Sequence, residues 1–180
     1  IDTSYYDNEK HTQADALSVI PFMDEMNYEG LSVSALLDGY YGLTIGGEFI
    51  GRFTARELER GINMALLQNT PQYKQAMKIR QMNEERWLKE RKMREFYWVE
   101  YNLMRKTGML WACNEAAVDT LRKYRPHDIF LQWNGALWLQ YMHKGIREDC
   151  VNEQQDLVNQ IYEQNKPIPL RIEIKKFTDL

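Results

Sequence analysis

Residues 69–108 read NTPQYKQAMKIRQMNEERWLKERKMREFYWVEYNLMRKTG, and this stretch decides the fold because its pattern predicts one long helix. Thr70 suits the N-cap position, and Pro71 suits the first helical position, where a missing N–H costs nothing. Neither glycine nor proline follows until Gly108, which can adopt the left-handed conformation that closes a helix. About 36 helical residues extend on the order of 54 Å. Such a rod must project or lie beside other helices, and its charged centre indicates packing at the two ends and a solvated middle.

The composition is that of a globular protein, with 44% hydrophobic and 27% charged residues among 180. The net charge is −3 and no basic block stands apart from acidic residues, which argues against nucleic-acid binding. No apolar run is long enough to span a bilayer, so we expect no membrane insertion. The start at Ile1, without a methionine, leads us to expect a processed or truncated product. Cys113 and Cys150 fit either one disulfide or two free thiols, and both readings stay open.

The first 53 residues predict a β-meander. Three segments have the composition of strands: residues 31–36, 40–45 and 48–53. Asp38-Gly39 and Gly46-Gly47 are typical of the tight turns that join such strands. Residues 1–6 are expected to add an edge strand.

Helices are expected between this meander and the C-terminal tail. Thr54 and Glu57 form a capping box, which predicts a short helix that ends near Gly61. The long helix comes next. Further helices are expected over three stretches: residues 110–124, a segment capped by Asp128, and a segment that opens at Asp149 or Cys150 and ends at Pro167.

The tail changes to a period of two. Ile168, Leu170, Ile172 and Ile174 alternate with polar or proline residues, which predicts a half-buried strand. A single strand after several helices needs a sheet to join, and the N-terminal meander is the candidate. The fold class is therefore α+β: a small, mostly antiparallel sheet with an inserted set of helices. We expect one unit over residues 1–180, in which 1–53 and 167–180 form the β part and 54–166 the helical part.

The candidates for catalysis are few. The serines are Ser4, Ser18, Ser32 and Ser34, and the histidines are His11, His127 and His143. No serine lies in a Gly-x-Ser-x-Gly or Gly-Asp-Ser motif. His11 is a candidate partner for a serine, but we favour its interpretation as an exposed loop residue. No cysteine or histidine has the spacing of a zinc site. We therefore assign no catalytic, cofactor-binding or metal-binding residue and expect no cofactor.

Aromatic residues crowd the later helices and offer the remaining candidate site. Trp138 and Tyr141 are three residues apart and share a helix face, and Trp111 lies upstream. Such rings either bury the seams between helices or form a surface that binds a sugar or docks another domain. We favour the core for Trp138, and we retain Trp138, Tyr141 and Trp111 as the candidate ligand or docking surface.

Segments of the first half follow a recognisable order. Ile1-Asp2-Thr3 precedes ALSVIPFMD at residues 16–24. Leu31-Ser32-Val33 and the hairpin Tyr41-Gly42-Leu43-Thr44-Ile45-Gly46-Gly47 follow. Phe53-Thr54, then Gly61-Ile62-Asn63-Met64-Ala65, then Thr70-Pro71 lead into the long charged helix. This order resembles the region that follows the catalytic domain in bacterial SGNH/GDSL-type hydrolases, although Gly46 stands where that family usually has aspartate.

The resemblance covers roughly the first 100 residues. In that family the catalytic serine, oxyanion-hole residues and Asp-x-x-His dyad precede this region, so no catalytic residue is carried over. The resemblance implies a non-catalytic C-terminal accessory region of an esterase or acyl hydrolase whose partner is the upstream catalytic domain. It also implies an acylated carbohydrate as substrate and a periplasmic or extracellular address.

Two other functions stay open at this point. The first is a stand-alone helical module that uses its tryptophan-rich helices to bind carbohydrate or a partner. The second, which we disfavour, is a self-sufficient enzyme of another type. An upstream reading frame with a Gly-Asp-Ser block would favour the accessory region over both.

Overall fold

The computed structural model describes residue 17 and residues 19–177. Its contacts divide the chain into two compact units. The first unit comprises Ile1–Met77 and Pro167–Leu180, and the second comprises Lys78–Lys166. The α+β class is confirmed: small antiparallel sheets are combined with several helices, one of them very long. The contacts group residues 54–77 with the sheet, whereas the sequence analysis assigned them to the helical part. The assignment of residues 1–180 to one domain stays a prediction.

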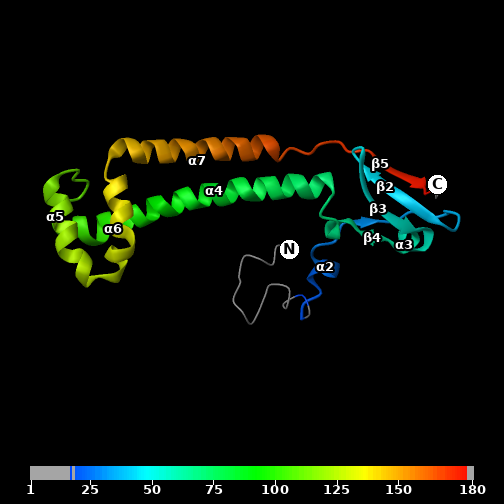
Figure 1. Ribbon diagram of the computed structural model, residues 1–180, viewed down its shortest axis with the longest axis horizontal. Helices are drawn as coiled ribbons and strands as arrows, with labels where there is room; N and C mark the ends of the chain where they lie inside the picture. The colour runs from blue at the N-terminus through cyan, green and yellow to red at the C-terminus, as the bar shows by residue number, and fades with distance from the viewer. Residues whose placement is uncertain (1–16, 18, 178–180) are drawn as a thin grey trace. The chain divides into compact units, whose positions relative to one another are not determined.

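A three-stranded antiparallel sheet forms the centre of the first unit (Figure 1). Its strands are β2 (Tyr40–Ile45), β3 (Glu48–Thr54) and β5 (Ile172–Lys176), in the order β3-β2-β5. Gly46 and Gly47 have positive φ angles, as the tight β2–β3 turn requires. Alternate residues of β2 are buried, so one face of the sheet packs on the core. The prediction that the C-terminal tail joins the N-terminal strands is confirmed.

The predicted first strand of the meander is wrong. Residues 31–36 do not pair with β2; instead the short β1 (Gly30–Leu31) pairs with β4 (Ile62–Asn63). Ala35 takes a left-handed conformation with φ of 63°, which breaks an extended segment. The free edge of β2 is then covered by β5. The strand expected over residues 1–6 lies outside the described residues.

Helix α3 (Ala55–Arg60) packs against the sheet of the first unit. Its capping box is confirmed: the Thr54 hydroxyl accepts from the Glu57 N–H, and the Glu57 side chain accepts from the Thr54 N–H. Gly61 ends the helix with φ of 93°. The unit also holds α2 (Phe22–Glu25) and a 3-10 turn (Met64–Leu66). Ala55 and Leu58 bury their side chains with Tyr41 of β2, so the capped helix closes one part of the core.

The long helix α4 (Pro71–Val99) is confirmed and continues as a π-helical segment, Glu100–Met104. The Thr70 hydroxyl accepts a hydrogen bond from the Tyr73 N–H at 3.2 Å, as expected of an N-cap. Gly108 has φ of 74° and follows the last turn. Throughout residue 17 and residues 19–177, no helix combines the length and apolarity needed to span a bilayer.

The rest of the second unit is helical. It contains α5 (Glu115–Tyr124), a 3-10 turn (Arg125–His127), α6 (Ile129–Tyr141) and α7 (Lys144–Gln164). Asp128 caps α6 as predicted, because its side chain accepts from the N–H groups of Phe130 and Leu131. The prediction that the last helix opens at Asp149 or Cys150 is wrong. It begins at Lys144, because the extended backbone of His143 ends the preceding helical course and makes His143 the N-cap. Arg147 donates to the carbonyls of Tyr141 and Met142, which satisfies the end of α6.

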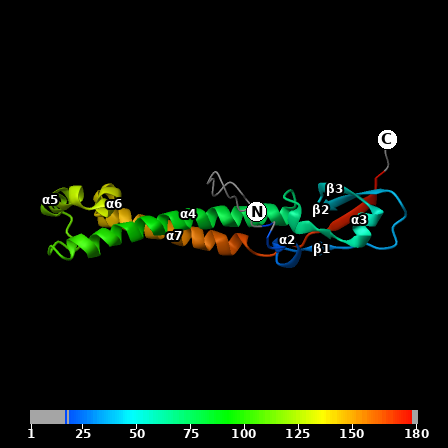
Figure 2. The ribbon, with the colours of Figure 1, turned by 90° about the horizontal axis from the view of Figure 1, so that it is seen from below.

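Within the second unit, α7 runs beside α4 (Figures 1 and 2). Lys89 of α4 forms an ion pair with Glu153 of α7. Cys150 faces the same seam, with its Sγ 3.7 Å from the Lys89 carbonyl oxygen. The core of the unit gathers apolar side chains from α4 to α7, among them Phe96, Val99 and Trp138. This core positions the pocket and the aromatic surfaces described next.

Candidate functional site

The serines within the described residues lie outside any serine–histidine pair. Ser32 donates a hydrogen bond to the Glu59 carbonyl at 3.1 Å, and Ser34 is exposed. Ser4, Ser18 and His11 lie outside the described residues. Among the residues that the structure describes, no group of three or more His, Cys, Asp or Glu side chains is arranged to hold a metal ion.

The structure brings together one thiol–imidazole pair that sequence reasoning missed. The Sγ of Cys113 lies 3.3 Å from Nδ1 of His143, although the two residues are 30 positions apart. His143 occupies the N-cap position of α7, and both residues are exposed. Cys113 and Cys150 are free thiols. A catalytic thiol also needs oxyanion donors beside a substrate cleft, and neither residue of this pair lines the pocket described below.

The three residues of the predicted ligand or docking surface are divided by burial. Trp138 is 0% exposed and Tyr141 is also buried, so neither ring presents a face to a ligand. Their burial agrees with the core position that the sequence favoured for Trp138. Trp111 is 45% exposed and packs edge-to-face against Tyr97 and Tyr101, with ring centroids 5.9 Å and 5.8 Å away.

A buried carboxylate fixes two of these tryptophans. Glu100 is 1% exposed and begins the π-helical segment. Its Oε1 accepts from Trp138 Nε1 at 2.8 Å, and its Oε2 accepts from the backbone N–H of Trp111 at 2.8 Å. Both oxygens thus have a donor, as a buried charged group requires. Trp111 itself has φ of 62°, so this contact holds a left-handed turn in place.

Tyr141 lies beside Cys150 in the same core. Burial of the phenol, followed by the influence of Cys150, raises the pKa of Tyr141 to about 12. The tyrosine therefore remains a neutral hydrogen-bonding group at physiological pH.

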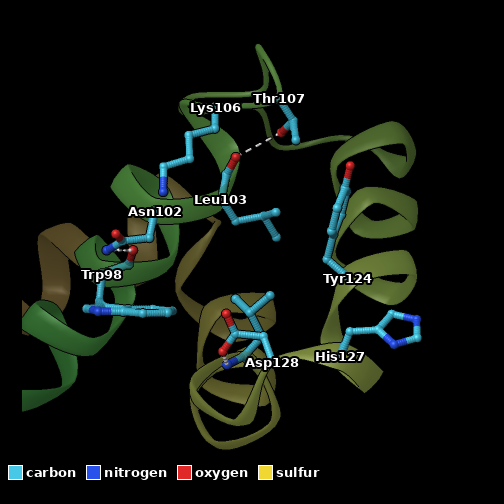
Figure 3. A pocket seen from close by; sticks show the side chains of 9 residues that line it. Trp98, Asn102, Leu103, Lys106, Thr107, Tyr124, His127 and Asp128 are labelled. Atoms are coloured by element: carbon cyan, nitrogen blue, oxygen red, sulfur yellow. Dashed lines mark hydrogen bonds between the residues drawn. The ribbon is translucent and has the colours of Figure 1, made fainter.

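A pocket of about 440 Å³ opens between the end of α4, the end of α5 and the start of α6 (Figure 3). Trp98 and Tyr124 lie on opposite sides of it, Lys106 enters from the top of the view, and Asp128 lies below. Its lining residues are Trp98, Asn102, Leu103, Lys106, Thr107, Tyr124, His127, Asp128 and Leu131. The ring of His127 turns away from the other lining side chains in this view.

Several polar groups of the pocket are already engaged. Asn102 Nδ2 donates to the Trp98 carbonyl at 2.9 Å, and the Thr107 hydroxyl donates to the Leu103 carbonyl at 3.0 Å. Asp128 uses Oδ1 for the helix cap. Within the described part of the chain, the Lys106 ammonium group makes no ion pair, and it retains its donors for a ligand.

An exposed aromatic row lies next to this pocket. Trp98 packs on Phe130 with ring centroids 5.2 Å apart, and Phe130 packs edge-to-face on Trp133 at 5.6 Å. Trp133 is 67% exposed. The sequence drew attention to the tryptophans but not to Trp98 as a pocket wall, because the pocket forms only where α4, α5 and α6 meet.

Comparison with known proteins gives a family and a structural relative. No curated protein matches the chain. The solved structure of a gut microbial diltiazem-metabolizing enzyme is 36% identical, with a TM-score of 0.82. That match covers 93% of this chain and 38% of the enzyme, so the chain spans well under half of the enzyme's length. Residues 77–166, half of the 180 residues, match the family model described as the diltiazem deacetylase C-terminal helical domain, and the chain belongs to this family.

Proposed function

We propose that this chain is the non-catalytic C-terminal accessory region of an SGNH-type ester hydrolase. In this role it stabilises the upstream catalytic domain of the same polypeptide and shapes the access of substrate to it. The observation that carries the proposal is the match of 93% of the chain to 38% of a larger enzyme. Membership of a family described as the C-terminal helical domain of a deacetylase supports the same role. Both observations favour an accessory region over a stand-alone binding module.

The same comparisons support ester hydrolysis as the reaction class of the whole protein. Deacetylation removes an acetyl group, and an ester hydrolase performs this step by attack of an activated nucleophile on the acyl carbon. We propose the SGNH type because the order of segments from the first residues to Thr70-Pro71 resembles the region after the catalytic domain in those hydrolases. The nucleophile then belongs to the upstream domain.

We further propose that the natural substrate is an acylated carbohydrate and that the protein works in the periplasm or outside the cell. Exposed aromatic side chains such as Trp133 and Trp111 suit contact with sugar rings. The address rests on the resemblance to exported hydrolases. Fractionation of the native cells with an antibody against this chain tests the address directly, and recovery in the cytoplasmic fraction alone would exclude it.

The accessory role is tested on the enzyme that contains this chain, compared with the same enzyme truncated immediately before Ile1. We expect the truncated enzyme to melt at a lower temperature because an apolar surface loses its cover. At a temperature where both forms are folded, the truncated form should retain hydrolysis of p-nitrophenyl acetate and lose hydrolysis of acetylated xylan. The measured quantities are the melting temperature and kcat/KM for each substrate.

Two results would reject this proposal. If the truncated enzyme matches the parent in stability and in kcat/KM for both substrates, the region is not an accessory to catalysis. If the upstream reading frame has no Gly-Asp-Ser block, the assignment to the SGNH type fails.

A further inference from the structure

We propose that the pocket formed by Trp98, Lys106, Tyr124 and Asp128 binds a neutral carbohydrate ring. The inference assigns a binding site within the accessory region and rests on the proposed function only for its biological setting. Its volume of about 440 Å³ lies within the range of small-molecule sites, about 300–1,000 Å³. All lining residues belong to the second unit.

Two aromatic side chains supply the walls. Trp98 presents its ring to the pocket while it packs on Phe130 at 5.2 Å, so its orientation is held from behind. Tyr124 stands across from it (Figure 3) and is exposed. The electron-rich face of an aromatic ring attracts the polarised C–H groups on the flat side of a pyranose. Leu103 and Leu131 add apolar surface between the walls.

The charges of the pocket favour an uncharged ligand. Lys106 brings a positive charge from one side, and Asp128 brings a carboxylate from the other. An anionic ligand is attracted by Lys106 but repelled by Asp128, and a cationic ligand is attracted by Asp128 but repelled by Lys106. Neither kind of charge therefore gains a net electrostatic attraction. The cap bonds from Phe130 and Leu131 moderate the charge of Asp128, which makes it a weak receptor for a cation.

The available hydrogen-bonding atoms suit hydroxyl groups. Lys106 offers donors, while Asn102 Oδ1 and Asp128 Oδ2 offer acceptors that make no hydrogen bond within residue 17 and residues 19–177. Each hydroxyl of a sugar can donate and accept at the same time, so a sugar ring can use donors and acceptors that lie side by side. An apolar ligand would leave these polar groups desolvated and unpaired.

The test is isothermal titration calorimetry on the full 180-residue chain. The probes are four neutral hexasaccharides, namely cellohexaose, xylohexaose, mannohexaose and hexa-N-acetylchitohexaose. An oligogalacturonate serves as the anionic comparison, a chitosan oligomer as the cationic one and free tryptophan as the zwitterionic one. We expect at least one neutral probe to bind at millimolar concentration or below and to bind more tightly than all three comparisons.

Matched variants locate the binding. Tyr124→Ala and Lys106→Ala should each weaken the best probe about tenfold, because each removes one contact of the pocket. Tyr162→Ala and Arg105→Ala are the matched controls, since Tyr162 is 75% exposed and neither residue lines the pocket. We expect both controls to bind within about twofold of the parent. Circular dichroism melts verify that each variant is folded.

Three outcomes overturn the inference. Absence of binding by all four neutral probes at millimolar concentration removes the site, and tighter binding of a charged probe or of tryptophan removes the neutral-sugar class. Equal binding by Tyr124→Ala, Lys106→Ala and their controls removes the pocket as the place of binding. These binding measurements do not depend on hydrolysis. If the 180-residue chain binds a neutral sugar but the enzyme that contains it has no esterase activity, the proposed function is rejected and the inferred binding site is retained.

Discussion

At the scale of single residues, the second unit depends on one buried carboxylate and the indole that reaches it. Trp138 is fully buried and donates to Glu100 at 2.8 Å. Replacing Trp138 with alanine leaves both a cavity and a carboxylate with one donor fewer. We expect Trp138→Ala to lower the free energy of unfolding by about 3–5 kcal/mol. Urea denaturation followed by circular dichroism measures the change.

Trp133 offers the matched control because it lies on the same helix and is 67% exposed. Trp133→Ala should change the free energy of unfolding by no more than about 0.5 kcal/mol. A Trp138→Ala midpoint equal to that of the parent would show that Trp138 is not part of the core.

A second residue, Tyr141, should make the free energy of unfolding depend on pH in the alkaline range. Burial, followed by the neighbouring Cys150, raises the pKa of Tyr141 from 10.0 to about 12, so between these pH values the folded chain keeps a proton that the unfolded chain releases. The stability from this group is present below pH 10 and is lost as the pH rises towards 12. Over this interval the free energy of unfolding should fall by up to about 3 kcal/mol on account of Tyr141.

Tyr141→Phe should remove that part of the pH dependence, and denaturant titrations at several alkaline pH values measure it. Tyr162→Phe is the control because Tyr162 is exposed and its substitution should leave the slope unchanged. Identical slopes for Tyr141→Phe and the parent would contradict the predicted effect of burial.

At the scale of elements, the sheet depends on a strand from the far end of the chain. Leu43 and Ile45 of β2 face Ile174 and Ile172 of β5 in register. Leu170 and Ile174 also pack on the buried residues of the first unit. Deletion of residues 167–180 exposes the edge of β2 and uncovers this apolar face. We expect a lower melting temperature or aggregation, measured by circular dichroism and light scattering.

A chain that ends at Phe177 serves as the control for this deletion, because it retains all of β5. It should melt like the parent. If the chain without residues 167–180 also melts like the parent, β5 does not stabilise the sheet.

The end of helix α4 departs from regular α-helical geometry at the residue that makes a buried contact. Its helical course changes to a π-helical segment at Glu100, and a π-turn alters which side chains face inward. Glu100 then meets Trp138 and the backbone of Trp111. The change of helix type thus coincides with the one buried carboxylate among the described residues.

At the scale of the whole molecule, the accessory role that we propose places the catalytic nucleophile in the upstream domain rather than in this chain. We therefore expect the purified 180-residue chain to show no saturable hydrolysis of p-nitrophenyl acetate above a boiled control. The exposed Cys113 beside His143 can be acetylated by this reagent, so a release of about one equivalent of nitrophenol is expected without turnover. Absorbance of released nitrophenolate measures both quantities.

Cys113→Ala separates the two quantities, since it should abolish the single release and leave the absence of turnover unchanged. Multiple turnovers that a serine-directed reagent abolishes would contradict the non-catalytic role. The search for a nucleophile would then return to Ser4, Ser18 and His11.

Local signals account for the parts of the fold that the sequence predicted correctly. The capping box at Thr54, the start at Pro71 and the cap at Asp128 each involve residues within one helical turn. Such contacts depend on neighbouring side chains and backbone conformation, so a pattern of a few residues is enough to indicate them. The alternation in the tail likewise predicted a strand that joins the N-terminal sheet, although not which strand of that sheet it pairs with.

Contacts between distant residues were decided by the tertiary structure alone. The alternation of β5 is compatible with either edge of the N-terminal sheet. The edge of β2 is open to β5 because residues 31–36 do not pair with β2 and β1 pairs with β4 instead. The same holds for Cys113 beside His143 and for the pocket that joins Trp98 to Tyr124. A sequence pattern specifies which face of an element is apolar, but the free energy of burying that face against one neighbour or another depends on packing of the whole core. The sequence by itself therefore determined the α+β class and the long helix, while tertiary packing decided which side chains meet and where a ligand can enter.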